Sequence, residues 1–386
     1  MLQGPYHILD PHLFWKGGKV TTGAPLHLWP MAALRLLLLP FSWLYGLVLR
    51  VRHALYDRGW LRSTAPGIPT INVGNIALGG TGKTPHVDLV LRTLLSGGGE
   101  APVLATLSRG YGRQDTALQE VAVDDDASTA GDEPLMLKRR FTGVRVFVGA
   151  DRVTALEAIQ RQVPGLRAVV LDDALQHRAV RAGLNLVLTT QQRPWYKDHL
   201  LPAGNLRDLP YRARQADAVI VTKCAQAPGP AEELRCRQRL GLRRDQPLFF
   251  SGLEYEAPRL LAGGAEVPTG AHTAALLLTG IADPAPLVDH VHQLFGTVRH
   301  LAFGDHHVFT KAELEGVAQV FHSFAAGPKT LITTGKDAAR LGEALQLPPL
   351  KDLPVAVVGI RAVILNEPYA FEALIRTYVT THPAHR

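Results

Sequence analysis

A glycine-rich stretch followed by lysine and threonine is the part of the sequence whose residue types point most directly to chemistry. It comprises Gly79, Gly80, Thr81, Gly82, Lys83 and Thr84. Glycines let successive backbone N–H groups turn toward one anion, and the N-terminus of a following helix adds positive potential. The lysine supplies charge to the outer phosphates and the threonine hydroxyl is a Mg²⁺ ligand. The stretch therefore predicts a nucleotide-binding phosphate loop.

One feature departs from the usual spacing of such loops. The first glycine is normally five residues before Gly82, where this chain has Ala77. A tight structural turn is the alternative explanation of a glycine cluster. The lysine and threonine that open the next helix favour nucleotide binding over that alternative.

Two consecutive acids, Asp172 and Asp173, end the apolar run "RAVVLDD". If that run is a buried strand, both carboxylates lie at the carboxyl edge of the sheet beside the phosphate loop. There they can hold Mg²⁺ directly or through water. The alternative is that one of them caps a helix, and the sequence does not say which of the two contacts metal.

The elements expected to position these residues are short apolar strands that alternate with helices. Strands are predicted at 70–74, 103–108, 144–149, 167–173, 184–190 and 217–223, and helices at 83–95 and 151–163. Continuous Val, Ile and Leu runs separated by helices indicate a parallel sheet covered on both faces.

The alternation pauses and then resumes. A hairpin around Gly263 and Gly264 is expected to form a linker, followed by strands at 274–280, 298–304, 330–335 and 355–364. Thr310 and Glu313 match a capping box at the start of a helix. The fold class is therefore α/β: a P-loop NTPase-like, mostly parallel sheet domain (63–246), a two-stranded linker (247–270) and a smaller α/β domain (271–386).

Residues 31–62 combine an apolar run with arginines. Five arginines and one aspartate give the segment a net charge of +4, more than half of the chain's +7. The uncharged stretch from Leu36 to Leu49 would span about 21 Å as a helix, short of the roughly 30 Å hydrocarbon core. Pro40 is expected to kink it or to mark an early turn. We predict a membrane-associated helix that either spans or lies flat, the alternative being a buried core helix.

Residues 1–30 show neither helical nor strand periodicity. Two explanations are open: a disordered N-terminal extension, or a true start at Met31.

Composition sets broad limits. Of the 386 residues 46% are hydrophobic and 19% charged, which favours a folded chain with a substantial core. Cys224 and Cys236, the only cysteines, fit neither a zinc site nor a disulfide framework. A reducing cytoplasm is the expected environment.

Along the chain, in this order, lie the segments "LLPFSWLYG", "VGNIALGGTGKTPHV", "LSRGYGR", "GDEP", "VGADR", "DDALQHR", "LPAGNLRD", "ADAVIVTK", "GIADP", "FGDHHVFT" and "TTGKDAARL". Taken together, these motifs resemble the tetraacyldisaccharide 4'-kinase family of Gram-negative bacteria. The resemblance implies transfer of phosphate from ATP, with Mg²⁺, to the 4'-hydroxyl of a tetraacylated glucosamine disaccharide 1-phosphate, giving lipid IVA. It further implies work at the cytoplasmic face of the inner membrane, with an N-terminal helix in that membrane.

The same resemblance assigns roles to site residues. Asp132 in "GDEP" is similar to the catalytic base, and His306, favoured over His307, to its partner. Glu133 would help to hold Mg²⁺ and Arg207 would face the transferring phosphoryl group.

Four positions depart from the family pattern. The family usually has glycine at Ala174, proline at Asn205, and glutamate at both Asp208 and Gly335. Roles at 208 and 335 are therefore in doubt, whereas Lys83, Thr84, Asp132 and the aspartate pair match.

Two other classes of protein are alternatives. A membrane-associated P-loop ATPase switch would also pair a nucleotide loop with an amphipathic helix, but such switches carry an early lysine where this chain has Ala77 and Leu78. The sequence pI near 9.5 suggests nucleic-acid binding, yet no DNA- or RNA-reading motif is present. No nucleic-acid partner is expected.

Overall fold

The structure is a computed structural model of the chain. It describes residues 8–9, 31–97, 100–110, 113, 115–305 and 307–385. The chain divides into two compact units, each of which is described by itself. The larger unit contains Gly23–Val123, Leu137–Glu254 and Arg361–Arg386, and the smaller contains Met1–Thr22, Asp124–Met136 and Tyr255–Ile360.

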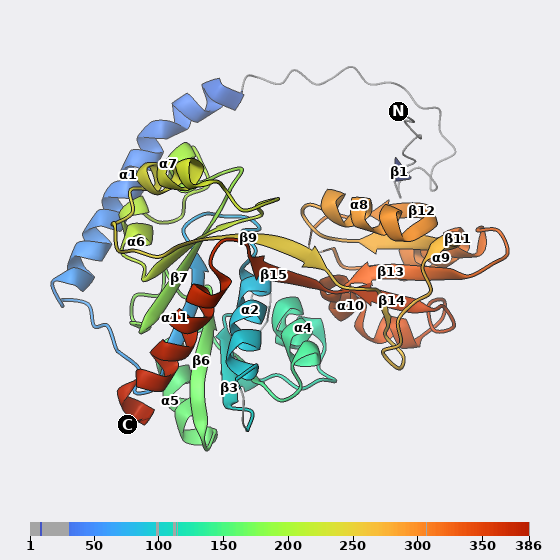
Figure 1. The fold of residues 1–386 in the computed structure, drawn as a ribbon, viewed down its shortest axis with the longest axis horizontal. Helices are drawn as coiled ribbons and strands as arrows, with labels where there is room; N and C mark the ends of the chain where they lie inside the picture. The colour runs from blue at the N-terminus through green and yellow to red at the C-terminus, as the bar shows by residue number, and fades with distance from the viewer. Residues whose placement is uncertain are drawn as a thin grey trace. The chain divides into compact units, whose positions relative to one another are not determined.

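The larger unit is built on a nine-stranded sheet with the order β15-β9-β8-β7-β2-β6-β3-β5-β4 (Figure 1). The strands are β2 (Thr70–Asn75), β3 (Val103–Ser108), β4 (Gln119–Glu120), β5 (Arg145–Val148), β6 (Leu166–Asp172), β7 (Leu184–Thr190), β8 (Ala218–Thr222), β9 (Leu248–Tyr255) and β15 (Ile360–Ile364). Pairing is parallel from β5 through β3, β6, β2, β7 and β8 to β9, and antiparallel between β4 and β5. Every residue of β2 is buried, as expected for a central strand covered on both faces.

Helices surround this sheet. They are α1 (Met31–Asp57), α2 (Lys83–Leu95), α5 (Arg152–Gln162), α6 (Pro210–Arg214), α7 (Pro230–Leu240) and α11 (Pro368–Thr381), with short 3₁₀ turns η2 (Trp195–Lys197) and η4 (Pro383–His385). The N-cap of α5 is Asp151, whose side chain accepts the backbone N–H groups of Val153 and Thr154. This cap explains why the helix begins directly after the strand β5.

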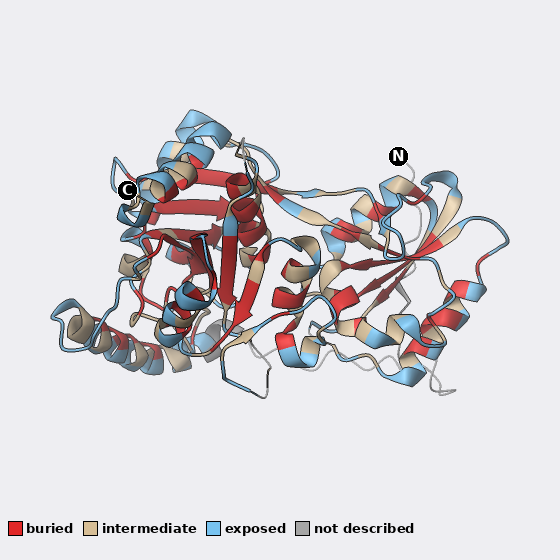
Figure 2. Ribbon diagram, turned by 90° about the horizontal axis from the view of Figure 1, so that it is seen from below, coloured by how far each residue is buried: buried red, intermediate tan, exposed pale blue. Residues whose placement is uncertain are grey.

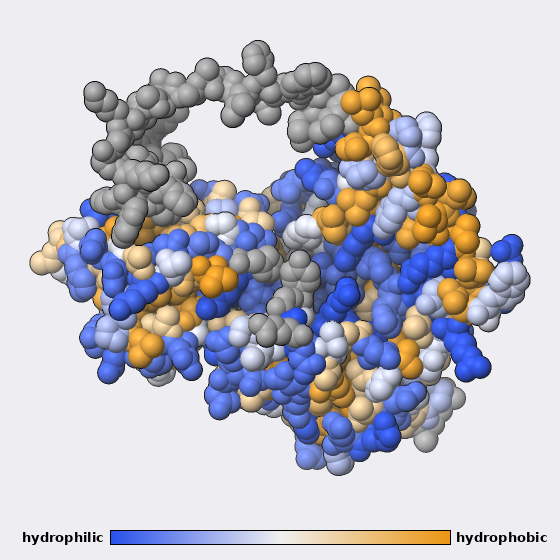
Figure 3. Space-filling model, turned by 180° about the vertical axis from the view of Figure 1, so that it is seen from behind, coloured by the Kyte–Doolittle hydropathy of each residue, from blue (hydrophilic) through white to orange (hydrophobic). Residues whose placement is uncertain are grey.

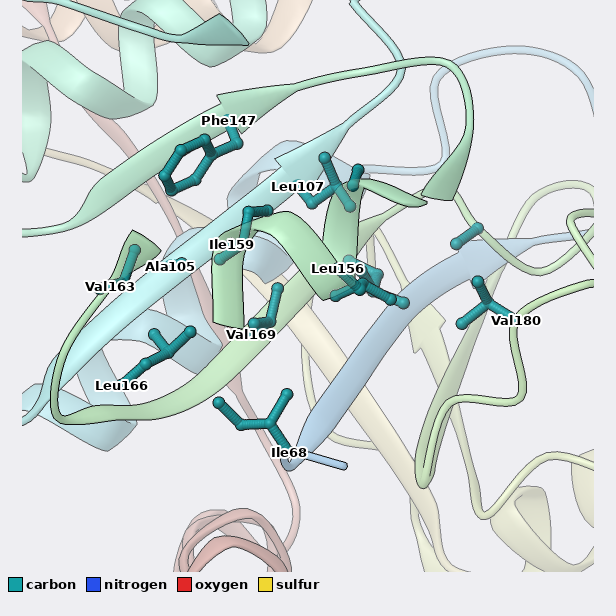
Figure 4. Packing of buried hydrophobic residues seen from close by; sticks show 13 residues of the cluster. Ile68, Ala105, Leu107, Phe147, Leu156, Ile159, Val163, Leu166, Val169 and Val180 are labelled. Carbon is teal, nitrogen blue, oxygen red and sulfur yellow. The ribbon is translucent and has the colours of Figure 1, made fainter. Parts of the chain in front are cut away.

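One core cluster shows how the sheet is covered. Leu156 and Ile159 of α5 pack on Ala105, Leu107, Phe147 and Val169 from β3, β5 and β6 (Figure 4). Each of these side chains is buried, so α5 anchors that face of the sheet through apolar contact.

The smaller unit is a six-stranded sheet with the order β1-β12-β11-β13-β14-β10. Its strands are β1 (Ile8–Leu9), β10 (Arg259–Leu260), β11 (Gly270–Thr279), β12 (Phe295–Ala302), β13 (Lys329–Thr334) and β14 (Val355–Val358). Its helices are α3 (Ala127–Ala130), α8 (Ala285–Leu294), α9 (Lys311–His322), α10 (Gly335–Leu341) and η3 (Gly342–Gln346). Only the pair β10 and β14 is antiparallel among the pairings described. In both units the central strands of the sheet are buried (Figure 2).

The expected fold class is confirmed: two α/β units, each with a mostly parallel sheet. The expected capping box of Thr310 and Glu313 is present at the start of α9. Gly263 and Gly264 both adopt positive φ, and Leu260 N–H donates to Ala265 O across the turn at 2.8 Å. The predicted hairpin is therefore present beside β10, inside the smaller unit.

The predicted strand at 355–364 is wrong in one respect. The structure divides it at Gly359 into β14 and β15, which belong to different sheets. Leu365 N–H donates to Phe250 O beyond the break, so β15 continues along β9. Gly359 interrupts the run, but a glycine within a strand pattern indicates a bulge as readily as a change of sheet, so the sequence does not reveal the change.

The unit boundaries also differ from the expected ranges, which were 63–246 for the larger domain, 247–270 for the linker and 271–386 for the smaller domain. The chain leaves the larger unit after Glu254 and returns at Arg361, so α11 belongs to the larger unit. The segment Asp124–Met136, expected within the 63–246 domain, belongs to the smaller unit. The helix α4 (Asp132–Arg140) crosses that boundary.

The helix α1 continues through Pro40 and ends at Asp57, where Gly59 with φ 75° follows. The early turn considered at Pro40 is therefore absent. Within the described residues, no helix combines the length and apolarity needed to cross a bilayer. Apart from Ile8–Leu9, the expectation for residues 1–30 lies outside the described residues.

Candidate functional site

The phosphate loop connects β2 to α2 and is open toward solvent. Gly79 and Gly82 have φ of 96° and 87°, a conformation that only glycine adopts without strain. A Cβ atom added at Gly79 or Gly80 would meet no atom within 4 Å. The α2 N-terminus at Lys83 thus follows a left-handed glycine turn with free space beside it, as an anion-binding loop requires.

Side chains outside the motif hold the loop in shape. Asn75 Nδ2 donates to Thr81 Oγ1 at 2.7 Å, and Thr222 Oγ1 donates to the Thr81 carbonyl at 2.9 Å. Thr81, predicted as a binding residue, therefore has its hydroxyl engaged within the protein. Asn75 and Thr222 were missed from the sequence, where each is only the last residue of an apolar strand.

His86 makes a further contact to the loop from the buried face of α2. Its Nδ1 lies 2.7 Å from the Gly82 carbonyl, which can only accept, so Nδ1 carries the proton. Nε2 then accepts from the Ser251 hydroxyl at 2.8 Å. Burial lowers the pKa of His86 to about 4 despite the bond to Gly82, so the ring is neutral at physiological pH.

Lys83, Asp173 and Arg207 form the charged centre of the larger unit. Lys83 Nζ lies 3.6 Å from Asp173 Oδ2, and Arg207 pairs with Asp173 Oδ1 and with Asn75 Oδ1. Asp173 has φ 56°, a left-handed backbone conformation directly after the end of β6. Both predicted cations of this unit therefore meet one of the two predicted acids.

The other acid, Asp172, ends β6 in register with Val73 of β2 and is 5% exposed. Thr84 lies in the first turn of α2 and is also buried. A hydroxyl and a carboxylate are the hard oxygen ligands that Mg²⁺ takes together with phosphate oxygens. The described residues contain no cluster of three or more His, Cys, Asp or Glu side chains suited to a metal. Thr84 and Asp172 fit a Mg²⁺ that arrives with nucleotide.

A second arginine stands near this centre. Burial, with help from Arg109, lowers the pKa of Arg152 to about 10, and Asp172 and Asp173 oppose the shift. Arg152 is still a cation at neutral pH. The sequence offered a signal for it, since "VGADR" places an arginine just after a predicted strand, but no role was assigned from it.

Asp132 lies in the smaller unit, in the first turn of α4. Its Oδ2 accepts from Arg340 Nε at 2.9 Å and from Arg340 Nη2 at 2.6 Å. Arg340 Nη1 donates to Asp337 Oδ1 at 2.9 Å, and Asp337 Oδ2 accepts the Gly280 N–H at 3.1 Å. Asp337 is fully buried, so it fixes Arg340, which in turn fixes the Asp132 carboxylate.

Glu133, the next residue, forms an ion pair of 2.6 Å with Lys336. Burial acts to lower the pKa of Lys336, but the charge and hydrogen bond of Glu133, with Asp132 behind it, outweigh burial and raise it. Within the smaller unit the pair Asp132–Glu133 is therefore matched by Arg340 and Lys336, neither of which was predicted. The motif "TTGKDAARL" contains both, but its role was not evident from sequence.

His307 is occupied by its own loop. Its Nε2 lies 3.0 Å from Glu313 Oε2, and its ring stacks on Phe303 with centroids 4.8 Å apart. His306, the predicted partner of Asp132, lies outside the described residues. Its assignment stays a prediction.

Local packing explains three of the four departures from the family pattern. A Cβ at Gly335 would lie 3.0 Å from Met136 Cγ, so the absent side chain makes room for the Asp124–Met136 segment. Asn205 donates its backbone N–H to Asp198 Oδ1 at 3.1 Å, a bond that proline cannot make. Asp208 is buried and bonded to His53 at 2.7 Å.

The predicted site residues thus fall into two groups. Lys83, Thr84, Asp172, Asp173 and Arg207 lie together in the larger unit. Asp132 and Glu133 lie together in the smaller unit. Each group is described within its own unit, so a common centre is a matter for proposal.

Comparisons with known proteins bear on this arrangement. The sequence profile of the family described as tetraacyldisaccharide-1-P 4'-kinase matches residues 34–380. A tetraacyldisaccharide 4'-kinase of Parabacteroides distasonis is 36% identical over 366 residues, covering 91% of this chain and 97% of the relative. That of Bacteroides thetaiotaomicron is 36% identical over 316 residues, covering 79% of this chain and 82% of the relative.

A solved structure agrees at the level of the fold. A crystal structure of the "apo" form of LpxK from Aquifex aeolicus in complex with ATP matches with a TM-score of 0.67 and 24% identity. It covers 90% of this chain and 99% of the other. The glycine loop, the two-unit fold and the extent of these matches together show that this chain belongs to the tetraacyldisaccharide-1-P 4'-kinase family.

Proposed function

We propose that this protein transfers the γ-phosphate of ATP to the 4'-hydroxyl of a tetraacylated glucosamine disaccharide 1-phosphate, giving lipid IVA in lipid A biosynthesis. The observation that carries the proposal is the open glycine loop with Lys83 and Arg207 beside Asp173, in a chain that matches this kinase family over residues 34–380. A membrane-associated ATPase switch would share the loop, but the family match does not favour it.

The cations of the larger unit serve the phosphate chain. Phosphoryl transfer has a loose transition state that depends on charge neutralisation more than on covalent help. Lys83 at the N-terminus of α2 is placed for the outer phosphates, and Arg207 for the phosphoryl group in transfer. Bound Mg²⁺ would neutralise phosphate charge, held by Thr84 and Asp172, with Asp173 and Glu133 as further candidate ligands.

Asp132 is proposed to accept the proton of the acceptor hydroxyl. A sugar hydroxyl is a weak nucleophile and needs a base as it attacks. Arg340 orients the Asp132 carboxylate through two hydrogen bonds to one oxygen. His306 is retained as the candidate that shares or relays this proton.

The helix α1 is proposed to seat the protein on the cytoplasmic face of the inner membrane. Among the side chains of α1 that the structure describes, eight large apolar ones are exposed: Leu36, Leu37, Phe41, Trp43, Leu44, Leu47, Val48 and Val51. Orange apolar side chains accordingly follow the outer face of this helix in Figure 3. A large exposed apolar patch with flanking arginines fits a bilayer surface that carries anionic lipid.

The test is transfer of label from γ-labelled ATP to the tetraacyl disaccharide 1-phosphate in mixed micelles. We expect a labelled, chloroform-soluble product. The same lipid with its 4'-hydroxyl removed should accept no label. Equal labelling of the two lipids would show that another hydroxyl is the acceptor and would refute the proposal.

A further inference from the structure

The loop that carries Arg207, residues 198–209, is bound to the phosphate loop on one side. Arg207 N–H donates to the Ile76 carbonyl at 2.8 Å, and Leu78 N–H donates to the Asn205 carbonyl at 2.8 Å. Ala77 and Leu206 form an antiparallel bridge between these bonds. The backbone of Arg207 is therefore held in register with the start of the phosphate loop.

The helix α1 holds the same loop from another side. Tyr45 Oη donates to the Arg207 carbonyl at 2.9 Å. Ser42 Oγ donates to the Leu200 carbonyl at 2.8 Å and accepts the Ala203 N–H at 3.0 Å. The approach is close, because a Cβ at Gly46 would lie 2.9 Å from Leu200 Cδ1.

A buried pair joins the two elements one residue further on. His53 Nε2 lies 2.7 Å from Asp208 Oδ1, and neither side chain is more than 1% exposed. Asp208 Oδ1 also accepts the Leu209 N–H at 2.8 Å. On its other side the His53 ring faces Tyr211 of α6 edge-on, with centroids 5.8 Å apart.

These contacts come from the face of α1 opposite to its exposed apolar side chains. One face thus meets solvent or lipid. The other bonds to the backbone of Leu200, Ala203 and Arg207 and to the side chain of Asp208. Burial, and then Asp208, raises the pKa of Tyr45, so its hydroxyl is protonated and can donate at neutral pH. The Arg207 guanidinium itself reaches Asn75 and Asp173 at the phosphate loop.

We propose that Tyr45 and His53, on α1, are positioning residues that set the guanidinium of Arg207 for phosphoryl transfer. The helix that seats the protein on the membrane is then also a support of the phosphate-transfer site. This inference rests on the proposed kinase function. Small displacements of a charged group from its productive position reduce turnover steeply, so support of the Arg207 backbone has a kinetic consequence.

The first test compares Tyr45→Phe with Tyr56→Phe. Both tyrosines lie on α1, but the Tyr56 hydroxyl makes no hydrogen bond to any residue that the structure describes, and its ring contacts Arg52 and Arg178 instead. Loss of one hydrogen bond should lower the kcat of Tyr45→Phe by between about twofold and about tenfold. The KM for ATP should change little, and Tyr56→Phe should match the wild type.

The second test compares His53→Leu with His53→Gln. Glutamine places a donor near the position of Nε2, whereas leucine removes it and leaves Asp208 with only the Leu209 N–H as donor. We expect kcat to fall in His53→Leu and to recover in large part in His53→Gln. All variants are assayed with saturating ATP and lipid at a temperature where thermal unfolding shows each to be folded.

Two results would overturn the inference. One is an equal kcat for Tyr45→Phe and Tyr56→Phe. The other is a change confined to the KM for lipid, which would assign the Tyr45 hydroxyl to membrane seating instead. Failure of the proposed function is distinguishable, because the wild-type protein itself would then transfer no phosphate to the lipid.

Discussion

The two charged clusters of this chain use the same residue types but are built in different ways. In the larger unit, Lys83 and Arg207 meet Asp173, and the cluster is held by loop backbone. In the smaller unit, Lys336 and Arg340 meet Glu133 and Asp132, and the cluster is held by the fully buried side chain of Asp337.

The difference indicates that the two clusters have different functions. A loop with free space beside its glycines can admit a phosphate chain. Lys83 and Arg207, which contact Asp173 in this structure, can then contact the phosphates instead. A network anchored on a buried carboxylate instead keeps one side chain, Asp132, in a fixed orientation. The first cluster is suited to binding nucleotide, the second to presenting a base.

The largest expected effect is that of Lys83→Met. Removing the cation of the phosphate loop should weaken ATP binding and lower kcat/KM by about 10³-fold or more, because charge neutralisation dominates phosphoryl transfer. Calorimetric ATP titration and steady-state kinetics measure the two effects. The exposed Lys351→Met is the control. Wild-type ATP affinity in Lys83→Met would contradict the role of the loop.

Asp132→Asn should distinguish the role of the smaller unit's cluster in turnover from the role of the larger unit's cluster in ATP binding. The amide keeps the shape of the side chain but removes a base, so kcat should fall by about 10²-fold or more while ATP affinity stays near the wild-type value. The same kinetics and titration measure it, with the exposed Asp352→Asn as control. Turnover close to that of the wild type would exclude Asp132 as the base.

Arg340→Met should lower the free energy of unfolding of the smaller unit, because Arg340 is the centre of its charged cluster. The change leaves the buried Asp337 without its cation, which costs about 3–5 kcal/mol in the free energy of unfolding. Arg259→Met in the same unit breaks a pair whose two side chains are each 60% exposed, and should cost about 1 kcal/mol or less. The unfolding free energy of each variant is measured by urea titration, with amide hydrogen exchange in α10 as the probe of the smaller unit. Equal costs would show that Asp337 does not anchor this network.

The smallest effect concerns one buried histidine in each unit. Burial lowers the pKa of both His86 and His300 to about 4. Below the unfolded value of about 6.5 the unfolded state takes up protons that the folded state does not. Above pH 6.5 the free energy of unfolding is therefore not reduced by either histidine. As the pH falls from 6.5 toward 4, it decreases by up to about 3 kcal/mol for each histidine.

Replacement of either histidine should flatten this acid dependence. Unfolding free energies between pH 4 and pH 7 are compared for His86→Gln, His300→Gln and, as a control, the exposed His322→Gln. An acid dependence in His86→Gln as steep as that of the wild type would mean that His86 is not buried and neutral.

The alternating strands, the glycine turn before α2 and the capping box of Thr310 could be predicted because their signals are local. The pairing of Asp132 with Arg340 could not, because 208 residues separate them in sequence. His86 was hidden for a different reason: it occupies a buried helix position where an apolar residue would also fit. The break at Gly359 could not be predicted, because a glycine inside a strand pattern does not say whether the chain changes sheet there.

The central claim is that phosphate leaves ATP for a lipid hydroxyl and not for water. The most direct test is the ratio of lipid phosphorylated to ATP consumed by the wild-type protein, measured in mixed micelles of the tetraacyl disaccharide 1-phosphate. The account predicts a ratio close to one. Steady release of free phosphate with little label in the lipid would contradict it.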